Sequence, residues 1–151
     1  MSLEGWKNNG WLKAHRTSPQ EIANLFAIVR RDLADAKARQ VSADWRFGIA
    51  YNAALKLCTI LLVAQGYRPD KSLAHYRTLQ ALPLILGAEK KEDADYLDAC
   101  RMKRNTVEYD TAGAATQADA EELVRFGESF LEEVEKWLRV HHPTLLDSQS
   151  R

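Results

Sequence analysis

The sequence has few of the features that mark secreted proteins, membrane-spanning proteins or proteins that bind nucleic acid through a high overall positive charge. It contains only two cysteines, Cys58 and Cys100, and each stands in an apolar stretch of helical character. Buried free thiols are therefore favoured over a disulfide, which fits a reducing compartment. Lysine plus arginine and aspartate plus glutamate balance at 21 each. No global basic field is available to attract nucleic acid, so any contact with RNA or DNA must come from a local patch.

Long apolar runs and a cleavable leader are also missing. The longest strongly apolar run, from Ile60 to Ala64, is too short to cross a bilayer, and no basic segment followed by an apolar one precedes a small-residue cleavage site. We therefore expect a cytoplasmic protein with no membrane contact. Alanine and leucine dominate over β-branched residues, which favours helix over sheet. A chain of 151 residues is expected to form one domain.

Apolar spacing and helix-start signals predict five helices. Ser18 and Ser42 are typical N-cap residues, and Pro19 suits the first helical position. Gly66 fits the position just after the second helix, and Pro83 is expected to kink or shorten the third. The predicted helices cover residues 18–40, 45–65, 73–86, 89 into the stretch 101–110, and 116–138.

This pattern predicts an all-α fold, an up-and-down bundle of four to five helices with no strand. Residues 18–142 form the predicted bundle, residues 1–17 an N-terminal arm, and residues 143–151 a polar C-terminal tail. The arm is either loose or held on the domain by its tryptophans. All four tryptophans are expected to pack rather than to offer a stacking surface, namely Trp6, Trp11, Trp45 and Trp137.

The predicted helix at 45–65 is apolar over more than half of its circumference. A helix of that kind is central and contacts several others. One layer of neighbours does not obviously cover it, which favours a dimer.

Residues 101–110 are the most chemically organised part of the chain. Three cations, Arg101, Lys103 and Arg104, stand here beside the amide of Asn105. At about 100° per residue, Arg104 lies within about 40° of the centre of the apolar helix face. Lys103 lies at the other margin of that face, whereas Arg101 and Asn105 point away from it.

A partly buried guanidinium needs partners for its five donors. Glu108, one helical turn after Arg104, is the nearest candidate. Asn52 and Lys56 interrupt the apolar surface of the central helix and are expected to face the same cleft. The competing interpretation is structural: Arg104 would tie its helix to a neighbour, and the other cations would only suit a helix C-terminus.

The stretch resembles the signature of the HEPN superfamily of small helical bundles. That signature is an arginine, a polar residue, three residues of any kind and a histidine. Arg104 and Asn105 match its first half, but Tyr109 stands where the family has its catalytic histidine. The resemblance covers roughly residues 20–140, through AYNAALKL at 50–57, GYR at 66–68, AHY at 74–76 and a closing amphipathic helix.

The resemblance implies a bundle of four or five helices, commonly a homodimer in which the motifs of two subunits meet in a cleft. Many HEPN proteins are metal-independent RNases that act as toxins in toxin–antitoxin or phage-defence systems. Others are non-catalytic partners of nucleotidyltransferases or other proteins. The implied partners of this chain are thus a second copy, RNA or a nucleotide, and an antitoxin or a nucleotidyltransferase, with no cofactor.

In catalytic HEPN proteins the histidine helps to activate the 2′-hydroxyl and the arginine stabilises the phosphorane. Carried over to this chain, the catalytic pair is Arg104 and Tyr109, and the binding set is Lys103, Arg104, Asn105 and Glu108. A phenol is a poor base at neutral pH because its pKa is about 10. Tyr109 can still donate a hydrogen bond to a phosphate or stack on a base.

The sequence therefore favours a non-catalytic or weakly catalytic domain that binds RNA, nucleotide phosphate or a protein partner. Two alternatives stay open. One is a metal-independent endoribonuclease that uses Arg104 with Tyr109 or with a displaced histidine such as His75. The other is a scaffold bundle without a nucleic-acid role, whose cationic motif is a network of ion pairs.

The remaining polar residues point to no other chemistry. His75 is expected to pack or to cap a helix. His141 and His142 would point about 100° apart on a helix and have no cysteine or carboxylate at ligand spacing, so no metal site is predicted. The sequence also has no glycine-rich phosphate loop and no nucleophile–histidine arrangement.

Overall fold

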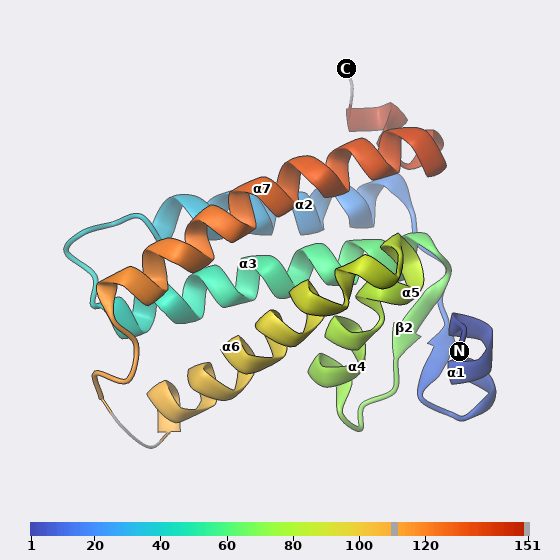
Figure 1. The fold of residues 1–151 in the computed structure, drawn as a ribbon. Coiled ribbons are helices and arrows are strands. Elements are labelled where there is room, and N and C mark those ends of the chain that lie inside the picture. Colours follow the sequence, from blue (N-terminus) through green and yellow to red (C-terminus); the bar gives the residue numbers. More distant parts are fainter. Residues whose placement is uncertain (110–111, 150–151) are drawn as a thin grey trace.

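Four long helices alternate in direction along the chain and form the body of the molecule (Figure 1). They are α2 (Pro19–Asp35), α3 (Ala43–Ala64), α6 (Lys91–Tyr109) and α7 (Gln117–His141). This computed structural model describes residues 1–109 and 112–149, without the side chains of 107–109 and 147–149. The predicted all-α class is confirmed. The shorter elements are α1 (Leu3–Asn8), β1 (Leu12–Ala14), β2 (Tyr67–Pro69), α4 (Ala74–Gln80), α5 (Leu82–Leu86) and the 3-10 helices η1 (Ala88–Lys90) and η2 (Pro143–Gln149).

The long helices begin and end at the residues that the sequence marks. The Ser18 hydroxyl accepts a hydrogen bond from the Glu21 amide, and the Ser42 hydroxyl accepts one from the Trp45 amide. Thr116 opens α7 with a reciprocal capping box. Gly66 follows α3 with φ +96°, a left-handed conformation that favours glycine. These contacts satisfy backbone groups that a helix end leaves unpaired.

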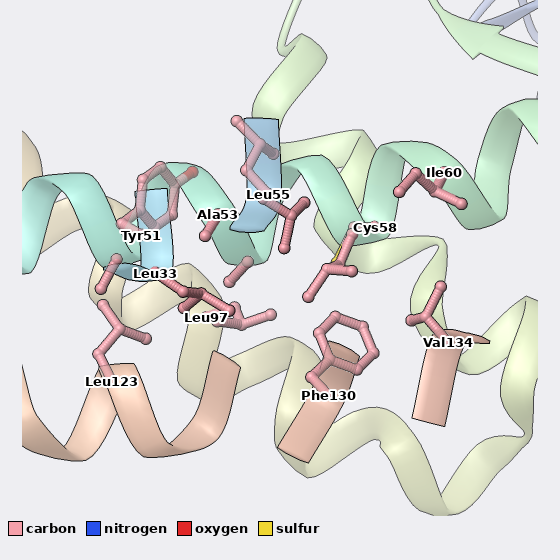
Figure 2. Close-up of a cluster of buried hydrophobic side chains, with 14 of the residues drawn as sticks. Leu33, Tyr51, Ala53, Leu55, Cys58, Ile60, Leu97, Leu123, Phe130 and Val134 are labelled. Atoms are coloured by element: carbon pink, nitrogen blue, oxygen red, sulfur yellow. The ribbon is translucent and has the colours of Figure 1, made fainter. Parts of the chain in front are cut away.

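The core is centred on α3, which α2 and α7 cover on one side and α4 and α6 on the other. Leu57, Ile60 and Leu61 have no exposed surface. Figure 2 shows core side chains from four helices meeting around α3, among them Leu33, Cys58, Leu97, Leu123 and Phe130. The central position predicted for this helix is confirmed. Because a single chain already buries α3, this helix no longer argues for a dimer.

α3 is long and apolar enough, by length and composition alone, to cross a membrane, but 72% of its most apolar window is buried inside the structure. Core helices often meet the same criterion. The short run Ile60–Ala64 therefore understated the apolar length of this helix. Cys58 and Cys100 are both buried and free, as predicted. Burial raises the pKa of Cys58 and raises that of Cys100 to about 11, so both stay thiols at neutral pH.

The prediction of no strand was wrong. β1 and β2 form a two-stranded antiparallel sheet in which Leu12 is opposite Pro69. Strands of three residues are too short to show a period of two, and their pairing joins segments distant in the sequence. Trp6 of α1 and Leu12 of β1 are buried against Leu62 and Ala81, so the N-terminal residues pack on the bundle.

Two further local predictions need correction. The third predicted helix is two helices, α4 and α5, separated at Ala81, with Pro83 in the first turn of α5. Trp45, expected to pack, is 61% exposed because it lies in the first turn of α3, away from the core face. At the other end of the chain, Leu145 and Leu146 of η2 pack against the core.

Candidate phosphate-binding site

The cations of α6 separate onto two sides of the helix. Neighbouring residues on a helix point about 100° apart, so Lys103 and Arg104 cannot face the same partner. Lys103 faces α7, where its ammonium lies 2.9 Å from a carboxylate oxygen of Asp119. Arg104 faces α3, where its guanidinium carbon lies 5.8 Å from the centre of the Tyr51 ring. Asn105 is exposed, as predicted, and α6 passes closely over α3 at Gly48.

Arg101 faces α4, beside Arg104, against the prediction that it faces away from the rest of the bundle. Three residues apart, the two arginines are neighbours on the helix surface. The Nε of Arg101 donates a hydrogen bond of 2.8 Å to Asp98, and its guanidinium carbon lies 5.8 Å from the centre of the Tyr76 ring. Helical spacing alone placed Arg101 away from the apolar face of α6. It could not show that α4 packs on this flank of α6 and covers Arg101.

Tyr51 is within reach of the charges of both arginines and is only 1% exposed. Among the described residues, none forms a hydrogen bond with its hydroxyl. Burial raises the pKa of this phenol, while the positive charges of Arg101 and Arg104 act in the opposite direction. A buried hydroxyl that donates to nothing carries a desolvation cost.

His75 of α4 approaches the same tyrosine, with the two ring centres 6.4 Å apart. Its side chain is exposed. Desolvation lowers the pKa of His75, and the positive charges of Arg104, Lys56 and Arg101 lower it further. The imidazole is therefore neutral at pH 7 and able to accept a proton. The sequence predicted that His75 packs or caps a helix; its ring lies against Tyr51 although the residue is exposed, and α4 has no side-chain cap hydrogen bond.

Lys56 of α3 belongs to this group, as expected, because its charge acts on His75. Asn52 does not: its amide donates a hydrogen bond of 2.6 Å to Asp32 of α2, on another side of α3. We call the set Tyr51, Lys56, His75, Arg101 and Arg104 the Tyr51 cluster. Asp98 is the acidic group paired within it.

Lys103 lies in a different environment. It lines a cavity of about 130 Å³ between α3, α6 and α7, together with Tyr96, Cys100 and Glu122. Its ion pair with Asp119 neutralises its charge, and the Tyr96 hydroxyl donates to Glu122. Burial and the nearby carboxylate raise the pKa of Tyr96. Lys103 is thus an inter-helix contact, separate from the Tyr51 cluster.

Two further predicted site residues and two histidines complete the set named from the sequence. Glu108 and Tyr109 belong to α6, but their side chains lie outside the described residues. His141 stacks on Trp137 with ring centres 4.9 Å apart, and His142 forms a 2.8 Å hydrogen bond with Gln65. Within residues 1–109 and 112–149, no three histidine, cysteine, aspartate or glutamate side chains are placed to hold a metal ion.

The Tyr51 cluster offers what binding of a phosphate diester requires. Its two guanidiniums, of which that of Arg101 already donates one hydrogen bond to Asp98, and one ammonium have further N–H donors for phosphate oxygens, and a neutral imidazole stands beside them. Sequence reasoning found Arg104 and Lys56 but not the approach of His75 and Arg101, which depends on how α4 packs on α6. The sequence AHYR at 74–77, with a histidine and an arginine on a short helix, was the available signal.

Comparison with protein-family models, with curated proteins and with solved structures yields no match to this chain.

Proposed function

We propose that this chain is a HEPN-like helical domain that binds RNA through phosphate groups at the Tyr51 cluster. The observation that carries the proposal is that the charges of Arg101, Arg104 and Lys56 converge on His75, with Arg101 and Arg104 also acting on the buried Tyr51. The resemblance in residues 20–140 adds RNA as the ligand and a toxin–antitoxin or defence system as the setting. A small antitoxin or a nucleotidyltransferase encoded next to this chain would support that setting.

Local cations, rather than the neutral net charge, would carry the affinity. Each phosphate contact to single-stranded nucleic acid contributes about 0.7 to the slope of log affinity against log salt. Two or three contacts from the cluster therefore predict a modest affinity that weakens with salt. Tyr76, beneath the guanidinium of Arg101, and His75 offer rings on which an unpaired base can stack.

Fluorescence anisotropy with a labelled single-stranded RNA tests the proposal. The double variant Arg101→Gln with Arg104→Gln should lose most of the affinity and reduce the salt slope by about 1.4, which is two contacts. The matched control is Lys136→Gln with Arg139→Gln, two exposed cations of α7 that remove the same charge. Equal losses in both variants would contradict site-specific binding. If Arg104→Ala abolishes the cooperative thermal transition and wild type binds no RNA, the scaffold interpretation is favoured instead.

A second function, metal-independent RNA cleavage, is favoured by the exposed and neutral His75. In this reaction the imidazole takes the proton of a 2′-hydroxyl, and the 2′-oxygen attacks the adjacent phosphorus. The bond from phosphorus to the 5′-oxygen breaks, and the leaving oxygen receives the proton back from the imidazolium. The products are a 2′,3′-cyclic phosphate and a 5′-hydroxyl, and Arg104 would stabilise the charge on phosphorus.

An oligonucleotide with one ribonucleotide among deoxynucleotides separates the two functions. If binding alone is the function, wild type leaves it intact, and Tyr109→His creates measurable cleavage where the motif geometry is kept. If His75 is the base, wild type cleaves it, and His75→Gln lowers the rate by about 10²–10⁴-fold. Tyr109→Phe should then leave the rate unchanged. Cleavage by wild type that survives His75→Gln would remove His75 from the reaction.

A further inference from the structure

A second basic site lies on the other side of α3 from the Tyr51 cluster. A cavity of about 340 Å³ opens where the loop after α2, the start of α3 and the first half of α7 meet. Figure 1 places α2 and α7 on one side of α3 and α4 and α6 on the other. We call this cavity the Arg46 pocket; its lining is Lys37, Arg39, Arg46, Glu121, Val124 and Arg125.

Arg46 is the residue of this pocket that the fold holds most firmly in place. It is only 6% exposed, although it stands in the first turns of the apolar helix α3. Its Nε donates a hydrogen bond of 2.7 Å to the carbonyl of Ala36, the C-cap residue of α2, and its Nη1 donates to Gln117 of α7. A guanidinium has five N–H donors, and these two bonds use two of them. Three donors of a rigidly held arginine are therefore available at the cavity wall.

The surrounding charges are unbalanced. Arg39 and Arg125 are exposed and form no ion pair with any residue in the described part of the chain. Lys37 is paired with Glu128, which leaves Glu121 as the carboxylate in the lining. Three arginines against one glutamate favour an anion, and guanidiniums match the oxygens of phosphate in bidentate geometry.

The lining also indicates which part of a ligand is recognised. Val124 is its one apolar member, and no aromatic ring is among the lining residues on which a base could stack. We propose that the Arg46 pocket binds a multiply charged phosphate, such as a diphosphate or triphosphate group, and is indifferent to a base attached to it. This site does not depend on the RNA-binding proposal, because the two sites share no residue.

Isothermal titration calorimetry with pyrophosphate tests the proposal in the Arg101→Gln, Arg104→Gln background, in which the Tyr51 cluster is disabled. Saturable one-site binding is expected there. Adding Arg39→Gln and Arg125→Gln should weaken it about tenfold or more for each arginine, since hydrogen bonds between charged partners are strong. Arg46 is left intact, because its bond to Ala36 holds the end of α2 and its removal would disturb folding. Lys136→Gln with Arg139→Gln is the matched control and should change nothing.

Competition between ligands defines the chemistry. Triphosphate and diphosphate nucleotides should displace pyrophosphate, adenosine should not, and the guanine and adenine nucleotides should compete equally. Absence of saturable pyrophosphate binding at millimolar concentrations would overturn the site. Binding that survives loss of Arg39 and Arg125 would overturn its location, and strong preference for one base would overturn the claim that phosphate alone is read.

Discussion

At the scale of single residues, the pKa of His75 can show whether a phosphate is bound at the Tyr51 cluster. Its pKa is lowered by desolvation and by three nearby positive charges, those of Arg104, Lys56 and Arg101. A bound phosphate would compensate those charges and favour the imidazolium. We therefore expect the pKa of His75, followed by NMR of the imidazole during a pH titration, to rise when phosphate-bearing ligand is added. Without ligand, Arg104→Gln should raise the pKa of His75, because it removes one of these positive charges. A pKa of His75 that does not change with ligand would place the phosphate elsewhere.

Tyr51 gives a second prediction at this scale, which separates an effect on stability from an effect on binding. Its hydroxyl is buried and has no hydrogen-bond partner among the described residues. Tyr51→Phe keeps the ring beneath Arg104 and removes a group whose desolvation costs about 1–3 kcal/mol. The melting temperature should stay equal or increase, and affinity for RNA should be unchanged, because a hydroxyl without exposed surface cannot donate to a ligand. A lower melting temperature with unchanged affinity would make the hydroxyl structural.

The residues of the motif could be found in the sequence, but their arrangement could not. Arg104 was placed correctly on the apolar side of its helix because helical angles are local. The grouping of Lys103 with Arg104 did not follow, since each is oriented by a different neighbouring helix. His75 and Arg101 approach Tyr51 only through the packing of α4 on α6. No single-sequence pattern records that contact.

At the scale of elements, the core stripes predicted from helical spacing can be tested directly. Leu57 of α3 is fully buried and Phe130 of α7 is 3% exposed. Leu57→Ala should lower the free energy of unfolding by about 2–5 kcal/mol, and Phe130→Ala by about 3–5 kcal/mol, because each leaves a cavity. Urea denaturation measures both. As a control, Glu132→Ala on the exposed side of α7 should change stability by less than about 0.5 kcal/mol. Wild-type stability in either core variant would show that its side chain is not essential to packing.

Helix starts were the most predictable elements because their signals are local. Ser18, Ser42 and Thr116 each accept a hydrogen bond from the amide three residues later. The short strands were not predictable, since the pairing of β1 with β2 joins segments more than fifty residues apart and depends on α1 packing beside them. The division of α4 from α5 was signalled locally: Pro83 was expected to kink or shorten the helix, and the break falls at Ala81, two residues before it.

At the scale of the whole molecule, the packing of the core does not determine whether the chain forms a dimer. α3 is covered within one chain, so a dimer needs another surface. Exposed apolar side chains stand at two of the three helices that carry the Tyr51 cluster: Leu73 just before α4, Tyr76 on α4, and Met102 on α6. Leu73 precedes α4 with φ +55°, a conformation that is uncommon for leucine. A self-complementary contact over this region would bring two copies of the cluster together, as the HEPN resemblance implies.

We therefore predict a two-fold dimer whose interface includes Leu73 and Met102. Analytical ultracentrifugation of the wild-type protein should give a molecular mass of twice the 17.1 kDa chain mass. Leu73→Glu with Met102→Glu should shift the protein to monomer, because paired interfaces would then oppose like charges across the two-fold axis. Val140→Glu, at an even more exposed apolar position on α7, is the control and should leave the dimer intact. If RNA affinity falls in parallel with dissociation, the two clusters act together in one site. A wild-type species of 17.1 kDa at all concentrations would contradict the dimer and leave each Tyr51 cluster to act alone.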